Sequence, residues 1–200
     1  MPLQPRRTID DLRELQQLTG DENGAQRVAW TETWERAREW LRGKVAETGA
    51  AESVDAAGNQ WFTLRGGSDR AVLIGGHIDS VPNGGWLDGA LNVMAGVEVL
   101  RRIAAEGAPP VTVRLVNWAD EEGARFGRSL FGSSAAAGSM ADQDELRERT
   151  DASVVSPCSG SGPFSRSFLA ASRVFSTSAS RLSVTTIWSI LARPSNASLQ

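Results

Sequence analysis

Residues 71–79 read AVLIGGHID, a run of apolar residues that ends in an imidazole and a carboxylate, as expected of a buried strand with polar side chains at its carboxyl end. A second apolar run, VTVRLVNW at 111–118, is followed by the acidic stretch ADEE at 119–122. Between the two, apolar residues from 90 to 104 recur at helical spacing, which indicates a helix. Strand, helix and strand in this order predict an α/β fold with a mixed sheet flanked by helices. In such folds sites form outside the carboxyl ends of the strands, where these polar residues lie.

Weaker signals of the same kind run through the rest of the first 150 residues. Thr8 is expected to cap a helix over residues 9–18. Residues 31–47 have the apolar spacing of an amphipathic helix. The other predicted features are a break at 20–24, a turn at 55–59, a short strand at 61–64, a short helix or turn at 130–138 and a charged helix at 142–149.

Composition limits the class of protein. A chain of 200 residues suits one domain, or one and a part. The net charge of -3 argues against nucleic acid or an anionic membrane as the main partner. Cys158 is the one cysteine, so an internal disulfide is excluded and a reducing compartment is expected. We find no apolar signal-peptide core and no apolar run near the ~20 residues that a membrane-spanning helix needs. We therefore expect a cytoplasmic protein.

The chain changes character near residue 150. Residues 1–150 hold 23 acidic residues, 17 basic residues and 7 serines, whereas residues 151–200 hold 1, 4 and 14. We therefore expect residues 1–150 to be one domain-like part and residues 151–200 to be a Ser-rich tail. Three interpretations of the tail stay open: a disordered tail or linker, an atypical folded segment, and a stretch translated out of frame. We favour the third, because out-of-frame GC-rich DNA tends to encode text rich in Arg, Ser, Pro and Ala.

Five side chains in the two segments are candidates for a metal-dependent hydrolytic site. His77 and Asp79 are two positions apart, so both point the same way in an extended chain, and Asp79 can orient the imidazole of a metal-bound His77. Asp88 follows in a Gly-rich turn, and a carboxylate can bridge two metals about 3.5–4 Å apart. Glu121 and Glu122 are adjacent, so one can bind metal while the other takes a proton from the attacking water. The pattern predicts half of a two-metal hydrolase site.

These motifs carry a resemblance to a known family. GGHIDSVPNGG at 75–85, DGAL at 88–91 and DEEGARF at 120–126 resemble the N-carbamoyl-L-amino acid hydrolase family. That family includes β-ureidopropionase and allantoate amidohydrolase, and it belongs to the zinc-dependent aminoacylase/carboxypeptidase superfamily. The resemblance covers residues 8–149. Gly76 stands where a serine is common in the family and Asn92 where a glycine is common, and we interpret both as minor variation.

The resemblance implies a zinc-exopeptidase-like metal-binding domain and a role for each candidate. His77 would bind one of two divalent metals, Asp88 would bridge both, and Glu122 would bind the second. Glu121 would be the general base, and Asp79 would be the carboxylate that orients His77. The metals would be zinc, with manganese, cobalt or nickel as alternatives. The reaction would be hydrolysis of a linear, non-peptide C–N bond in an N-carbamoyl-L-amino acid or related ureide.

The chain also departs from that family. His77 is its only histidine, whereas the resemblance implies two more histidine ligands, and an arginine and an asparagine for the substrate carboxylate, from later in the chain. The inserted domain through which the family forms homodimers is missing as well. We therefore expect an N-terminal part of such an enzyme, inactive by itself, whose lineage acts on a small-molecule ureide. Two alternatives stay open: a peptidase or deacylase of the same superfamily, and a non-catalytic truncated product.

Overall fold

The computed structural model describes residues 2–140, and the predicted helix at 142–149 and the segment 151–200 lie outside them. No helix in this part of the chain is long and apolar enough to cross a membrane. The elements in chain order are α1 (Pro5–Thr19), β1 (Gly20–Asp21), β2 (Gly24–Ala25), α2 (Glu32–Ala46), β3 (Ala51–Val54), β4 (Gln60–Leu64), β5 (Ala71–His77), α3 (Ala90–Ala104), β6 (Thr112–Trp118) and α4 (Phe131–Ala136).

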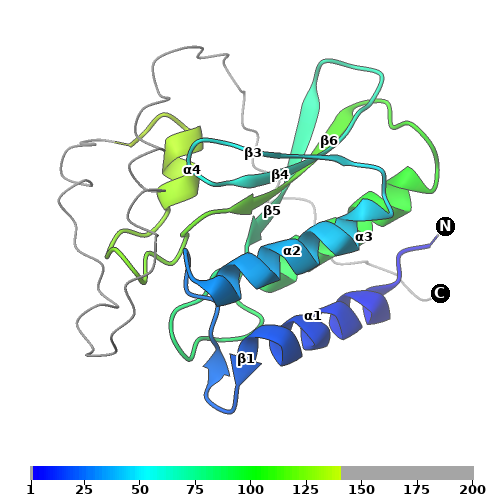
Figure 1. Ribbon diagram of the computed structural model, residues 1–200. Coiled ribbons are helices and arrows are strands. Elements are labelled where there is room, and N and C mark those ends of the chain that lie inside the picture. Colours follow the sequence, from blue (N-terminus) through cyan, green and yellow to red (C-terminus); the bar gives the residue numbers. More distant parts are fainter. Residues whose placement is uncertain (1, 141–200) are drawn as a thin grey trace, which may run out of the picture.

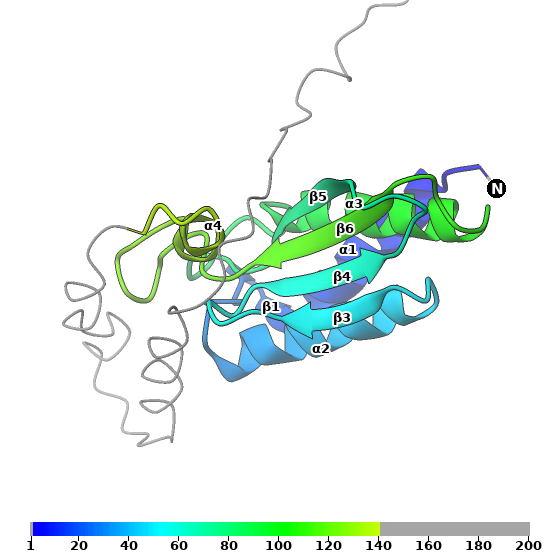
Figure 2. The same ribbon diagram turned by 90° about the horizontal axis from the view of Figure 1, so that it is seen from above.

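Strands β3 to β6 form a four-stranded mixed sheet in the order β3-β4-β6-β5 (Figures 1 and 2). β4 runs antiparallel to both of its neighbours, whereas β5 runs parallel to β6. The helix α3 connects β5 to β6, as a parallel pair requires a crossover. The predicted mixed α/β architecture is therefore confirmed. The two parallel strands β5 and β6 have their carboxyl ends side by side.

The three long helices lie on one face of this sheet, and α4 lies near the end of β6 (Figures 1 and 2). α3 packs against β5 and β6, and α1 packs against α2 and α3. Each layer contributes to one buried cluster, which includes Leu15 of α1, Leu41 of α2, Val97 of α3, and Phe62 and Leu115 of the sheet. The apolar faces predicted for α2 and α3 thus form the core, whereas in α1 only Leu12 and Leu15 of the predicted apolar positions are buried and Ile9 and Leu18 are exposed.

The first helix begins earlier than predicted, and Thr8 is not its cap. The helix starts at Pro5, and Thr8 is buried inside it. Proline suits the first turn because its φ is already helical and its missing N–H has no partner there in any case. Thr31 does act as a cap, since its hydroxyl accepts a hydrogen bond from the backbone N of Trp34 at 3.3 Å. The helix predicted at 31–47 is confirmed to within a residue at each end.

Three short strands have no counterpart in the sequence prediction. β1 and β2 are two residues long each and fall in or beside the stretch predicted as a break. β3 lies at the edge of the sheet, and its residues are mostly exposed. An exposed edge strand needs no alternation of apolar and polar residues, so it leaves little pattern in the sequence.

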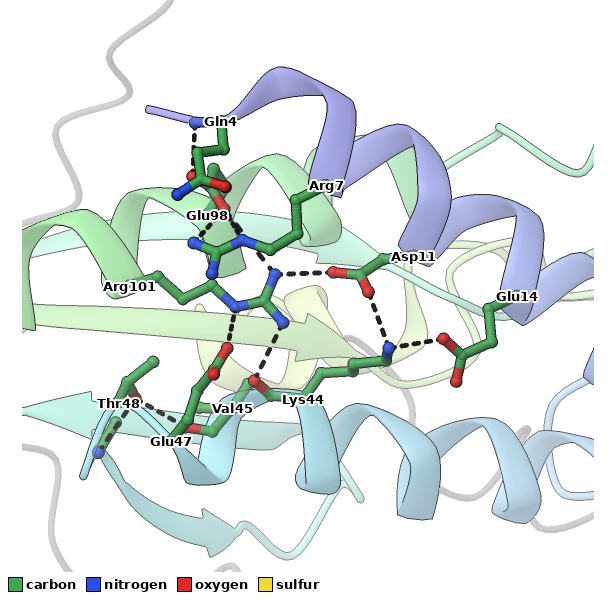
Figure 3. Close-up of polar contacts among 11 residues, drawn as sticks. Gln4, Arg7, Asp11, Glu14, Lys44, Val45, Glu47, Thr48, Glu98 and Arg101 are labelled. Atoms are coloured by element: carbon green, nitrogen blue, oxygen red, sulfur yellow. Dashed lines mark hydrogen bonds and ion pairs between the residues drawn. The ribbon is translucent and has the colours of Figure 1, made fainter. Parts of the chain in front are cut away.

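Charged residues join α1 to α2 and α3 inside the helical layer (Figure 3). Asp11 accepts a hydrogen bond from Arg101 at 2.7 Å and pairs with Lys44 at 2.8 Å. Glu98 pairs with Arg7 at 2.8 Å. Asp11, Glu98 and Arg101 are all buried. A buried charge without its partner is strongly destabilising, so these pairs specify how α1 docks on the other two helices.

Candidate metal centre

The ends of two parallel strands bring the predicted site segments together. His77 is the last residue of β5 and lies opposite Trp118, the last residue of β6. The chain continues from these residues into Asp79 on one side and into residues 119–122 on the other. The backbone N of Glu122 donates a hydrogen bond to Oδ2 of Asp79 at 3.1 Å. A hydrogen bond therefore joins the two motifs, which are some forty residues apart in sequence.

His77 lies between two carboxylates. Its side chain is buried, and its Nδ1 lies 3.1 Å from the carbonyl oxygen of Asp79 and 3.5 Å from Oδ1 of the same residue. Its Nε2 faces Oε2 of Glu121 at 3.5 Å. The shorter contact of Nδ1 is thus to the backbone of Asp79, with the carboxylate that was predicted to orient the ring close behind. A hydrogen bond at Nδ1 leaves Nε2 as the nitrogen available to a ligand.

The carboxylates also control the charge of His77. Burial alone lowers the pKa of an imidazole, but the hydrogen bonding and charge of Asp79 and the charge of Glu121 outweigh it and raise the pKa of His77 to about 9. At neutral pH the ring is therefore protonated in the absence of a bound cation. A divalent cation at Nε2 would replace that proton and keep the carboxylates neutralised.

Two further carboxylates in the site have raised pKa values. Burial raises the pKa of Glu122, as do the charges of Asp88, Asp79 and Glu121, while the charge of His77 lowers it. Burial and the charge of Asp79 raise the pKa of Asp120 to about 7. Negative charge is concentrated here beyond what one imidazolium neutralises, which is the condition under which a cation binds favourably.

A glycine brings the turn that carries Asp88 against the imidazole. Gly89 has a φ of 60°, and a Cβ placed on it would lie 2.4 Å from the ring of His77. A residue with a side chain could not occupy this position without moving the ring. Asp88 itself is exposed, and its charge acts on Glu122. The structure thus gathers all five predicted site residues in one neighbourhood at the end of the β5–β6 pair.

The donor types in this neighbourhood fit a zinc-like cation, which takes imidazole nitrogen and carboxylate oxygen. Oδ1 of Asp79 is buried and accepts no hydrogen bond of ordinary length, since its contact with Nδ1 of His77 is 3.5 Å, so it has capacity for a further ligand. Within residues 2–140, however, no group of three His, Cys, Asp or Glu side chains is arranged to hold a metal ion. The residues that the structure describes supply one histidine with its carboxylates, which is part of a coordination sphere. The assignment of His77, Asp88 and Glu122 as ligands stays a prediction.

Sequence reasoning missed the polar residues that brace these strand ends. Asn117 accepts a hydrogen bond from the backbone N of Ile78 at 3.0 Å, next to His77. Asn59 accepts one from the backbone N of Ala119 at 2.9 Å, just before the acidic motif, and donates one to the carbonyl of Gly132 at 2.9 Å. Both asparagines are buried. Asn59 ends the predicted turn at 55–59, and a turn residue carries no sign that its side chain reaches another strand.

Comparison with known proteins places the chain in a family. The profile described as peptidase family M28 matches residues 59–196. The chain belongs to peptidase family M28. Among curated relatives, it is 40% identical over 122 residues to the N-carbamoyl-L-amino acid amidohydrolase of Geobacillus stearothermophilus, a match that covers 58% of this chain and 29% of that protein. It is 32% identical over 136 residues to the allantoate amidohydrolase of Bacillus subtilis (strain 168), covering 66% of this chain and 33% of that protein.

Solved structures agree with these relatives. The crystal structure of a hydantoinase/carbamoylase family amidase from Burkholderia ambifaria superposes with a TM-score of 0.70 and 32% sequence identity, covering 76% of this chain and 38% of that chain. The predicted resemblance to the carbamoylase and allantoate amidohydrolase group of hydrolases is therefore confirmed. The chain spans about a third of the length of the curated relatives it matches. The predicted boundary at residue 150 lies outside the described residues and stays a prediction.

Proposed function

We propose that this chain carries one part of the active site of a metal-dependent amidohydrolase that cleaves a linear C–N bond in an N-carbamoyl-L-amino acid or related ureide. The observation that carries the proposal is the placement of His77 among Asp79, Asp88, Glu121 and Glu122 at the carboxyl end of a parallel strand pair. The relatives that the chain matches over part of its length are N-carbamoyl-L-amino acid and allantoate amidohydrolases.

Each residue has a role in this proposal. His77, Asp88 and Glu122 would hold the divalent ions, zinc in the first place, with manganese, cobalt and nickel as alternatives. A bound ion would supply Lewis acidity to the water and to the ureide carbonyl. Glu121 would take the proton of the attacking water, because its carboxylate lies at the Nε2 side of the imidazole, 3.5 Å from that atom. Asp79 would hold the His77 ring in one orientation.

The expected partner is a small-molecule ureide or N-carbamoyl amino acid, in the cytoplasm. A net charge of -3 supports a partner other than nucleic acid or an anionic membrane. The resemblance also implies a homodimer.

Two other functions each have an observation in their favour. A peptidase or deacylase is supported by the family, whose printed description is peptidase family M28. A non-catalytic protein is supported by the single histidine of the chain and by the lack of a three-donor metal group within residues 2–140. Zinc normally takes three protein ligands in a catalytic site.

The test is hydrolysis by the full chain, incubated in turn with zinc, manganese, cobalt and nickel. Ammonia release from an N-carbamoyl-L-amino acid or from allantoate supports the proposal, and Glu121→Gln should reduce it by about 10²–10⁴-fold. Glu32→Gln is the matched control, because Glu32 is an exposed glutamate in the first turn of α2. Turnover of N-acetyl amino acids or dipeptides alone would favour the peptidase or deacylase. Because a part of such an enzyme is expected to be inactive by itself, zinc binding measured by calorimetry separates the remaining cases. A chain that turns over none of these substrates and also binds no zinc would favour the non-catalytic protein.

A further inference from the structure

Arg27 is a buried arginine whose partners are neutral oxygen atoms. Its side chain is fully buried, and its guanidinium donates three hydrogen bonds. Nε donates to the carbonyl of Ile78 at 2.7 Å, and a terminal nitrogen donates to the carbonyl of Trp86 at 3.3 Å. The other terminal nitrogen donates to the hydroxyl of Thr19 at 3.3 Å. In the part of the chain that the structure describes, Arg27 forms no ion pair at contact distance.

The two carbonyls belong to the ends of one loop, residues 78–86. Ile78 directly follows His77, and Trp86 precedes Asp88 by two residues. One planar guanidinium therefore joins the point where the loop leaves β5 to the point where it reaches the Asp88 turn. An arginine is suited to this because its donors are held in a rigid fork, whereas a lysine offers a single ammonium.

The backbone around Arg27 runs along the same loop. The backbone N of Ser80 donates to the carbonyl of Arg27 at 3.0 Å, and the hydroxyl of Ser80 accepts from the backbone N of Arg27 at 3.0 Å. Ala25 and Gly84 exchange two backbone hydrogen bonds, at 2.9 and 3.2 Å. Residues 25–27 and the guanidinium thus form hydrogen bonds with the beginning, the middle and the end of the loop.

Stability alone is a poor reason to keep a cation at this position. Burial lowers the pKa of Arg27 to about 10, and the charge of Asp79 offsets only part of that effect. A buried charge that is not paired at contact distance is expensive in free energy. An apolar side chain would fill the space at lower cost, but it could not bond both carbonyls.

We propose that Arg27 is a positioning residue of the candidate metal centre, which fixes the separation of His77 and Asp88 by joining the two ends of the loop between them. The inference rests on the proposed function only in that His77 and Asp88 are taken as ligands. The joining of the loop ends is independent of whether any metal binds.

The experiment compares three variants of the full chain: Arg27→Met, Arg27→Lys and, as the matched control, Arg101→Met. Arg101 is also buried and hydrogen-bonded, but it lies in the helical layer (Figure 3). Amide hydrogen exchange of residues 78–89 is measured by mass spectrometry, with urea unfolding as the measure of global stability. After correction for the global stability of each variant, amides in this segment should exchange at least about tenfold faster in Arg27→Met than in Arg101→Met. A factor of this size is what the loss of a hydrogen bond from a charged group gives.

The exchange rate of residues 78–89 in Arg27→Lys should lie between those of the wild-type chain and Arg27→Met. This variant also decides the role of Arg27 if Arg27→Met fails to fold. Exchange in residues 78–89 that follows global stability equally in the Arg27 and Arg101 variants would overturn the inference. The second readout is the zinc affinity of the same proteins, measured by calorimetry. If the wild-type chain binds zinc, Arg27→Met should weaken it at least about tenfold more than Arg101→Met does, and an equal effect would overturn the inference. If the wild-type chain binds no zinc, the proposed function fails while the exchange result still decides the role of Arg27.

Discussion

Gly76 and Asn92 form one coupled pair in this structure, although each differs from what is common in the resembling family. A Cβ placed on Gly76 would lie 2.9 Å from Cβ of Asn92 and 3.2 Å from the carbonyl oxygen of Gly89. Real Cβ atoms essentially never approach other atoms closer than 3.0 Å. The family more often has serine at the first position and glycine at the second. The side chain would thus be on the strand there and is on the helix here, and we expect the two differences to compensate each other.

This geometry predicts the outcome of a double-mutant cycle. Gly76→Ser should destabilise the chain by about 1–3 kcal/mol, because the new side chain overpacks against Asn92. Asn92→Gly should cost a few tenths of a kcal/mol, roughly the difference in helix propensity between asparagine and glycine. The double variant should cost little more than Asn92→Gly, because the space freed at position 92 accepts the serine. The coupling energy between the two positions should therefore be about 1–3 kcal/mol.

Urea unfolding followed by tryptophan fluorescence measures the four free energies of unfolding. Gly43→Ser is the control for adding a serine, because a Cβ at Gly43 would meet nothing within 4 Å. It should be neutral or slightly stabilising, since serine is the better helix former. Additivity of Gly76→Ser and Asn92→Gly within about 0.5 kcal/mol would refute the reasoning, because independent sites add to that accuracy.

Two other stability predictions follow from the ion pairs. Asp11→Asn should lower the free energy of unfolding by about 1–3 kcal/mol, because Arg101 and Lys44 both lose a charged partner while Arg101 keeps its ion pair with Glu47; a loss below about 0.5 kcal/mol in urea unfolding would contradict this. Burial raises the pKa of Glu52, but hydrogen bonds from Arg42 and Gln60 and the charge of Arg42 lower it by more. The pKa of Glu52 in the folded chain is therefore below 4.5. The stability that Glu52 contributes is present above pH 4.5 and is lost as the pH falls through the folded pKa. The free energy of unfolding, measured from pH 6 to pH 3, should therefore fall less in Glu52→Gln than in the wild-type chain. An equal fall in both proteins would contradict this.

The parallel strands β5 and β6 and the helix between them could be predicted from the sequence because their apolar residues leave a strong pattern. The runs at 71–77 and 112–118 are mostly apolar, and α3 packs against both strands. Because parallel strands end at the same edge of a sheet, the proximity of His77 and the acidic motif followed without knowledge of the rest of the fold. Local apolar pattern and strand direction were sufficient for this much of the site.

The braces of the site could not be predicted, because their chemistry contradicts the usual meaning of the residue. Arginine and asparagine are mostly exposed in proteins, so Arg27, Asn59 and Asn117 gave no sign of burial. Each is buried because it satisfies backbone groups of a segment far away in sequence. Asp11 is a similar case, since its partner Arg101 is on another helix. Such contacts depend on the tertiary fold and leave no local periodicity.

The most direct test of the account is zinc titration of the full chain by isothermal calorimetry at neutral pH. We predict that the wild-type chain binds zinc, and that His77→Gln and Asp88→Asn each weaken binding at least about tenfold. Asp69→Asn is the control, because Asp69 is an exposed aspartate before the other end of β5, and it should leave binding unchanged. Binding should also release protons, since His77 is protonated in the metal-free site. A wild-type chain that binds no zinc, or binds it equally well with His77→Gln, would contradict the assignment of this cluster as a metal centre.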